Sequence, residues 1–273
     1  MIISRRLPMD ALYDETLRRL DEAFQKLEIK VPLPRKMPHG DSWVFRYKER
    51  TIHQAMIQKL ARVMSGLHAA RLLCDNGLVQ EQSSIQRMLD EFHQDISFLA
   101  FAVIKNEITP LHQKYLDAFY KEEFDPIAEK PLLDRPTVPR KKIRAYLARL
   151  DQEASTDHSS AVTAYHTVYS ANSGFIHGAS PHIMDMFGGY PPRFQIHGMA
   201  GTPRHESHRY DLYNYFFRTI TSFSLVAKAF GDEDLFQELR SWLVQFDSQS
   251  GRNEMYQNPP SRDRQGTSPS EKP

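Results

Sequence analysis

Hydrophobic residues recur at steps of three and four along most of the chain, which places them on one face of a helix. No stretch alternates between apolar and polar residues over more than a few positions, so a large sheet is not expected. The clearest helical segment is residues 51–76, which Gly77 follows as a left-handed terminator. The pattern predicts an all-α protein, a bundle of about seven to eight helices.

The same spacing predicts where the other helices lie. The first is expected to begin near Asp10 and to end near Ile29. Residues 82–106 carry the widest apolar stripe, which predicts a central helix that forms an antiparallel hairpin with residues 51–76. The remaining helices are expected at residues 110–124, 139–151, 155–178, 210–230 and 232–246.

Residues 30–50 interrupt this pattern and are predicted to be a linker. Three prolines and Gly40 fall in the segment, and they remove the backbone donors and dihedral angles that a helix needs. Trp43, Val44 and Phe45 are large and apolar, so they are expected to anchor the linker to the core.

The C-terminal end is polar. From Ser248 onward only Met255 and Tyr256 are apolar, while Pro, Ser, Arg and Gln dominate. Such a segment cannot offset the entropy of ordering itself. We therefore expect a single helical domain over residues 1–247 and a disordered tail over residues 248–273.

Composition excludes some functions. The 273 residues include 35 Lys plus Arg against 34 Asp plus Glu, so a formal charge of +1 gives no whole-protein field for nucleic acid, and any such binding needs a local patch. The longest apolar run, residues 98–104, falls far short of the ~20 residues of a membrane-spanning helix. No membrane partner and a cytoplasmic location are expected. Cys74, the single cysteine, is expected to be a small buried apolar residue.

Glycine and histidine are concentrated in one region. Six of the twelve glycines fall between Gly174 and Gly201, and seven of the twelve histidines between His158 and His208. Glycine permits close backbone approach, and histidine titrates near neutrality or binds metals. The pairing predicts an irregular loop after Gly178 that either carries a site or is an ordered surface loop.

A polar stripe precedes this loop. Tyr169, Ser173 and His177 are four residues apart, so a helix would place a phenol, a hydroxyl and an imidazole on one face. Ser173 and His177 could touch, as nucleophilic catalysis requires, yet no Gly-x-Ser-x-Gly turn accompanies them. The stripe is a candidate catalytic face.

A second group of candidates also repeats every fourth residue. Arg87, Glu91 and Asp95 lie along the flank of one apolar stripe. One interpretation is a surface Arg–Glu pair worth a few tenths of a kcal/mol. The other is that Glu91 or Asp95 crosses the bundle and orients His177 for acid–base work.

Metal binding is disfavoured by the spacing of the candidate ligands. No His-Glu-x2-His and no paired Glu-x2-His occur, so no metal and no cofactor are expected. The candidate metal ligands in this region are five histidines and two carboxylates: His177, His182, His197, His205, His208, Asp185 and Glu206.

Two motifs resemble a bacterial all-helical family of unknown function. The segment Tyr-x3-Ser-x3-His-Gly at residues 169–178 resembles the family's signature, and Arg87-x3-Glu91 is similar to its Arg-x3-Glu helix. Such families are distantly similar to HEPN domains, in which an Arg-x4-6-His motif cleaves RNA across a dimer interface. This chain departs from that motif, because residues 170–172 are Ser, Ala and Asn. The resemblance implies a helical fold and points to His177.

Two classes of function follow. The favoured hypothesis is a module that binds a protein or RNA partner in a bacterial defence or mobile-element system, since no complete catalytic constellation is visible. The alternative is a HEPN-like ribonuclease or nucleotide-acting enzyme that uses Tyr169, Ser173 and His177. In either case, a homodimer is a reasonable expectation.

Overall fold

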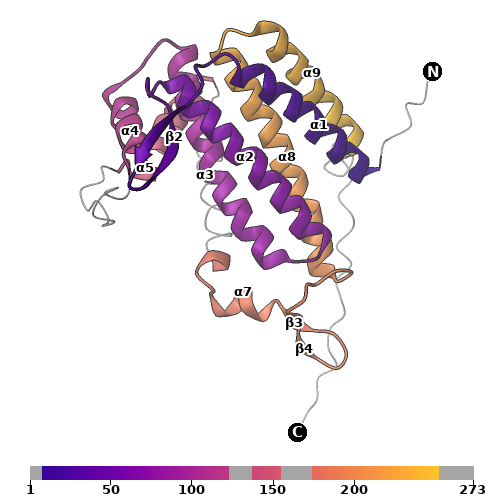
Figure 1. Ribbon diagram of the computed structural model, residues 1–273. Coiled ribbons are helices and arrows are strands. Elements are labelled where there is room, and N and C mark those ends of the chain that lie inside the picture. The colour runs from indigo at the N-terminus through magenta and orange to yellow at the C-terminus, as the bar shows by residue number, and fades with distance from the viewer. Residues whose placement is uncertain (1–7, 123–136, 155–173, 252–273) are drawn as a thin grey trace, which may run out of the picture.

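The computed structural model describes residues 8–122, 137–154 and 174–251, which form eight helices and four short strands. Five long helices make up the body of the molecule and lie side by side (Figure 1). They are α1 (Met9–Glu28), α2 (Ile52–Asp75), α3 (Val79–Ile104), α8 (Pro203–Ala229) and α9 (Glu233–Ser250). The predicted all-α bundle is confirmed. None of the helices in these residues is long and apolar enough to cross a membrane.

The α2–α3 hairpin is the centre of this bundle, as the apolar stripes predict. Leu67 of α2 and Leu89 and Ile96 of α3 are completely buried, and α8 packs against both helices. Close approach is possible because Gly66 has no side chain: an added Cβ would lie 2.8 Å from Leu89 Cδ2. Cys74 is buried at the end of α2, as expected.

Helix ends follow local sequence signals. The Thr51 side chain accepts a hydrogen bond from the Gln54 backbone N–H at 3.2 Å, and the Gln54 side chain accepts one from the Thr51 N–H at 3.0 Å. This reciprocal cap begins α2 by satisfying donors that the first turn leaves unpaired. Gly77 ends α2 with a φ of +69°, as predicted.

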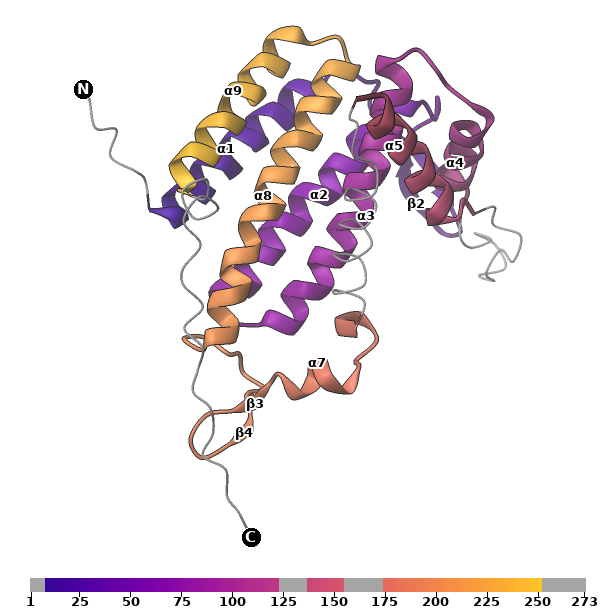
Figure 2. The same ribbon diagram turned by 180° about the vertical axis from the view of Figure 1, so that it is seen from behind.

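Smaller elements lie at the two ends of the bundle (Figures 1 and 2). At one end lie helices α4 (Pro110–Tyr120) and α5 (Arg140–Ala154) with the strands β1 (Arg35–His39) and β2 (Ser42–Arg46). At the other end lie α7 (Ser180–Met184) and the two-residue strands β3 (Phe187–Gly188) and β4 (Arg193–Phe194). We call residues 174–201 at this second end the tip segment.

Two predictions about the elements are wrong. The segment at residues 30–50, which was predicted to be a linker, contains the β1–β2 hairpin. Its prolines gave no indication of strands. Helix α8 begins at Pro203 and not near Tyr210, because Thr202 caps it and Pro203 occupies its first position, where no backbone donor is needed. Its first two turns are rich in polar residues, so the spacing of apolar residues did not indicate a helix there.

Two further expectations fall mainly outside the described residues. Of the helix expected at residues 155–178, only residues 174–178 are described, and 174–176 are helical. Of the expected tail at 248–273, only residues 248–251 are described; α9 extends through Ser250 and ends at Gly251, which has a φ of +73°.

Candidate nucleic-acid interface

The hairpin of β1 and β2 is built around a two-residue turn. Met37 pairs with Val44, and the pair His39–Ser42 closes the ladder around Gly40 and Asp41. Gly40 has a φ of +57°, at the turn position where a type II′ hairpin requires a positive φ and favours glycine. The local sequence therefore fixes both the turn and the register.

The outer face of this hairpin carries an exposed aromatic pair. Directly opposed residues of an antiparallel pair share a face, so Lys36, Pro38, Trp43 and Phe45 lie on the same side. Trp43 is 50% exposed and Phe45 54% exposed. Their rings meet edge to face at 5.0 Å between centroids, and the Lys36 ammonium lies 4.0 Å from the Trp43 ring centroid. An aromatic surface beside a cation is thus open to solvent.

The inner face anchors the hairpin to the bundle. Arg46 donates two hydrogen bonds to Glu122, just beyond α4, from Nε to Oε1 at 2.6 Å and from Nη2 to Oε2 at 2.9 Å. The hydrogen bond from Arg46 lowers the pKa of Glu122. Tyr120 of α4 donates from its hydroxyl to the Thr51 carbonyl at 2.7 Å, which ties α4 to the start of α2. These contacts leave the opposite face free.

The expectation that Trp43 and Phe45 anchor this segment to the core is wrong. Both side chains are about half exposed, while Val44, which alternates with them, is partly buried. A two-stranded ribbon can turn only one face toward the bundle, so neighbouring residues separate to opposite sides. The overlooked signal is the Gly40–Asp41 turn between two short runs of five residues.

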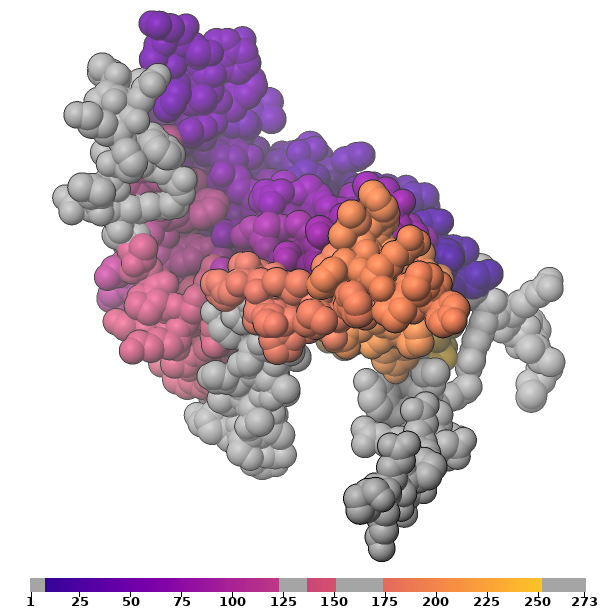
Figure 3. All heavy atoms as spheres, turned by 90° about the horizontal axis from the view of Figure 1, so that it is seen from below, coloured from indigo at the N-terminus to yellow at the C-terminus, as the bar shows by residue number. Residues whose placement is uncertain are grey.

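Positive charge is concentrated around the same hairpin. Between residues 35 and 50 there are five Lys or Arg residues against two acidic residues, although the whole chain has a formal charge of only +1. All five are exposed: Arg35, Lys36, Arg46, Lys48 and Arg50. The hairpin stands out from the rest of the molecule when the bundle is seen from the tip-segment end (Figure 3). It presents the local basic patch that nucleic-acid binding requires.

Of the predicted polar stripe, Tyr169 and Ser173 lie outside the described residues. His177 is exposed in the tip segment. Among the residues that the structure describes, His177 makes no hydrogen bond to Glu91 or Asp95. The structure therefore gives no support to a carboxylate that orients this imidazole.

Glu91 and Asp95 instead belong to an ion network that joins α2, α3 and α5. Asp95 is completely buried; Lys59 Nζ lies 2.8 Å from its Oδ2, and Arg140 donates to it as well. Arg87 Nη2 lies 2.9 Å from Glu91 Oε1, and Arg140 Nη2 lies 3.2 Å from Glu91 Oε2. The Arg87–Glu91 pair therefore forms, but it is not the surface pair that was expected, because Arg87 is buried. We call these five residues the Asp95 ion network. It fixes α5 against α3 at the same end as the hairpin.

Tyr115 of α4 lies beside this network. Burial, and then the neighbouring charge of Asp95, hold the pKa of the Tyr115 hydroxyl well above its ordinary value. The phenol therefore stays neutral at physiological pH. With each carboxylate paired to a cation and the phenol protonated, the cluster is suited to holding helices together.

Two histidines of the region attach α8 to the turn between α2 and α3. His205 bonds through Nε2 to the Cys74 carbonyl at 2.6 Å and accepts the Gly201 N–H at Nδ1. His208 lies 3.2 Å from the Ser83 hydroxyl, and burial lowers its pKa to about 4. Both side chains are buried and hydrogen-bonded, which suits a packing role. Within the described ranges, no group of three His, Cys, Asp or Glu side chains could hold a metal ion.

Comparison with known proteins adds no relative. No protein-family model matches the sequence, and searches of curated proteins and of solved structures find no match.

Proposed function

We propose that this chain binds single-stranded nucleic acid through the outer face of the β1–β2 hairpin. The observation that carries the proposal is the exposed Trp43–Phe45 pair beside Lys36, within a stretch, residues 35–50, that has five Lys or Arg residues against two acidic residues. Unpaired bases stack on such rings, and lysine and arginine neutralise the adjacent phosphates.

Charge favours nucleic acid over a protein partner. Protein interfaces are enriched in aromatic residues but depleted of lysine, particularly at their centres. Here Lys36 lies against the Trp43 ring, on the same face of the hairpin as the two aromatic residues. A single strand is favoured over a duplex, because only unpaired bases offer their faces to side-chain rings.

The hypothesis of a bacterial defence or mobile-element module is compatible with this binding role. The alternative, a HEPN-like ribonuclease, depends on Tyr169, Ser173 and His177. Exposure of His177 in the tip segment, at the other end of the bundle from the hairpin, does not favour it. We therefore propose binding without cleavage.

Fluorescence anisotropy of a labelled single strand of about 12 nucleotides tests the proposal. The double variant Trp43→Ala with Phe45→Ala is expected to weaken binding roughly tenfold or more, because each stacked base contributes ~1–3 kcal/mol. The ligand strand should be recovered intact after incubation, whereas its cleavage would favour the ribonuclease alternative.

The β3–β4 hairpin supplies a matched control. Phe187 and Phe194 are each 45% exposed and also meet edge to face, at 5.1 Å. Changing both to alanine removes a similar aromatic pair where only Arg193 brings a nearby positive charge within the strands. Binding by this variant should equal that of the parent. The proposal is wrong if neither RNA nor DNA strands bind, or if both double variants lose affinity equally.

A further inference from the structure

A cavity of about 540 Å³ opens between the β1–β2 hairpin and α4. This volume is within the ~300–1,000 Å³ typical of small-molecule sites. It lies next to the aromatic outer face, because Phe45 both contacts Trp43 and lines the cavity. The lining residues are Pro34, His39, Phe45, Arg46, Tyr47, Arg50, Gln58, Phe119, Tyr120, Lys121 and Glu122.

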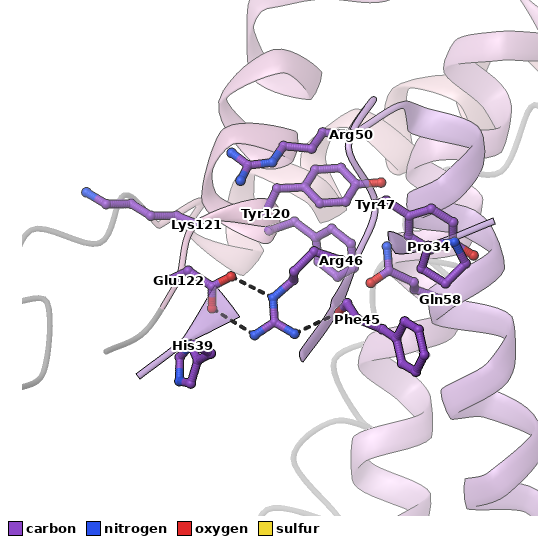
Figure 4. Close-up of a pocket in the computed structure, with 11 residues that line it drawn as sticks. Pro34, His39, Phe45, Arg46, Tyr47, Arg50, Gln58, Tyr120, Lys121 and Glu122 are labelled. Atoms are coloured by element: carbon purple, nitrogen blue, oxygen red, sulfur yellow. Dashed lines mark hydrogen bonds and ion pairs between the residues drawn. The ribbon is translucent and has the colours of Figure 1, made fainter. Parts of the chain in front are cut away.

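The walls of this cavity differ in chemistry. Figure 4 shows the rings of Phe45 and Tyr47 on one side, with the charged ends of Arg50 and Lys121 directed to the other. Among the described residues, three permanently charged cations and one carboxylate line the space, so this part of the lining is positively charged. An aromatic wall facing a cationic one suits a ligand with a flat ring at one end and an anionic group at the other.

Arg50 is the cation best placed for such an anion. Arg46 is already held by both oxygens of Glu122, whereas Arg50 has no ion pair among the residues that the structure describes. Its backbone has a φ of +55°, in the left-handed region that a residue with a long side chain rarely adopts. Strained backbone of this kind is concentrated at ligand sites, where it aims a side chain.

The aromatic wall also carries groups that can meet the edge of a base. Gln58 lies in the lining with its amide directed into the space between the rings (Figure 4), and its Nε2 donates to the Gln54 carbonyl at 3.2 Å. His39 lies at the opposite margin, beside Glu122. Burial raises the pKa of Tyr120, so its hydroxyl stays protonated and continues to donate to the Thr51 carbonyl. The ring of Tyr120 is thereby fixed as part of the wall.

We propose that this cavity takes one nucleotide of the bound strand, with the base against Phe45 and Tyr47 and the phosphate at Arg50. The inference rests on the proposed function and deepens it, since the strand on the outer face would enter the cavity past Phe45. A phosphotyrosine side chain also joins a ring to a phosphate. The nucleotide is favoured because the cavity continues the surface on which neighbouring bases would stack.

Isothermal titration calorimetry of the full chain with adenosine 5′-monophosphate tests this inference. The nucleotide should bind at millimolar concentrations, and adenosine and inorganic phosphate at least about tenfold more weakly, since each offers one half of the ligand. Arg50→Ala is expected to lower the affinity for the nucleotide about tenfold. Arg240→Ala, which removes an equal charge from α9 on the far side of the bundle, should leave it unchanged.

The outcomes separate this inference from the proposed function. If single strands bind and lose affinity in the Trp43 and Phe45 variant while the mononucleotide does not bind, the cavity assignment is overturned and the proposed function stands. If the mononucleotide binds and strands do not, the proposed function is overturned. Equal affinity for inorganic phosphate, or tighter binding of a phosphotyrosine peptide, overturns the assignment to a nucleotide.

Discussion

Asp95 shows how strongly a single buried carboxylate can affect the stability of the fold. It has no exposed surface and faces the cations Lys59 and Arg140, which would lose their shared partner if it were neutral. Removing one member of a buried ion pair is far more damaging than losing a surface pair, because the remaining charges stay desolvated. The sequence spacing correctly paired Arg87 with Glu91 but could not show that Lys59 and Arg140 come from two other helices.

The first prediction compares Asp95→Asn with Asp10→Asn. The Asp95 variant should lose about 3 kcal/mol of unfolding free energy, because two partly buried cations remain without their carboxylate. The Asp10 side chain is 58% exposed and pairs with Arg71 at 3.0 Å, so its variant should lose less than about 1 kcal/mol. Urea denaturation measures both. Losses of equal size would show that the Asp95 ion network does not stabilise the fold.

His208 gives a prediction about pH. Burial lowers its pKa to about 4 from the ordinary 6.5, so the folded chain holds the imidazole neutral while the unfolded chain binds a proton. Its stabilisation is therefore complete above pH 6.5 and is lost as the pH falls toward 4. Between pH 7 and pH 5 the loss should be about 2 kcal/mol.

The control for this prediction is His208→Gln, which cannot titrate. Denaturation of parent and variant at pH 7 and pH 5 should show a smaller pH dependence in the variant. Burial also lowers the pKa of His93, which lies 2.8 Å from the Ser222 hydroxyl, so part of the dependence should persist. An unchanged dependence in the variant would contradict a buried neutral His208.

Among the elements, the turn between α2 and α3 holds the tip segment by backbone contact. The Met199 N–H donates to the Gly77 carbonyl at 2.7 Å, and a Cβ on Gly77 would lie 2.3 Å from the Ala200 nitrogen. Gly77→Ala should therefore lower the free energy of unfolding for two reasons. The added Cβ must displace backbone, which costs ~1–3 kcal/mol, and the left-handed φ costs a further ~1 kcal/mol.

Gly201→Ala separates these two effects. Gly201 has a φ of +76°, but an added Cβ would meet nothing within 4 Å, so only the conformational cost should appear. Thermal and chemical denaturation should rank Gly77→Ala as clearly less stable than Gly201→Ala. If the two variants are equally stable, the tip segment is not fixed against the turn by this contact.

The elements also show what periodicity can and cannot predict. Burial imposes a repeat of three to four on long helices, and for this reason α2 and α3 were located within a few residues. The β1–β2 hairpin is exposed on most of its surface, so no core selects its pattern and only its turn residues mark it. The start of α8 was missed because buried His205 and His208 take positions where apolar residues were sought.

At the scale of the whole molecule, composition was a poor guide to the candidate site. A formal charge of +1 averages a basic hairpin with acidic positions elsewhere, and sequence order alone does not show that Trp43, Phe45 and Lys36 share one exposed face. The sequence predicted a site in the histidine-rich region because the number of each residue type can be read from a sequence. The exposure of a side chain cannot be read in this way, because it depends on which surfaces the bundle leaves uncovered.

The last prediction uses that contrast between net and local charge. Binding to a single strand should weaken with salt, with a slope of log affinity against log salt near −3, because about four cations of residues 35–50 other than the paired Arg46 release counterions. Lys36→Gln, which removes a cation of the outer face itself, should make the slope shallower by about 0.7. Arg240→Gln changes the net charge of the chain equally, but on α9, and should leave the slope as it was. If both variants shift the slope alike, the strand responds to the charge of the whole chain, and the hairpin is not its site.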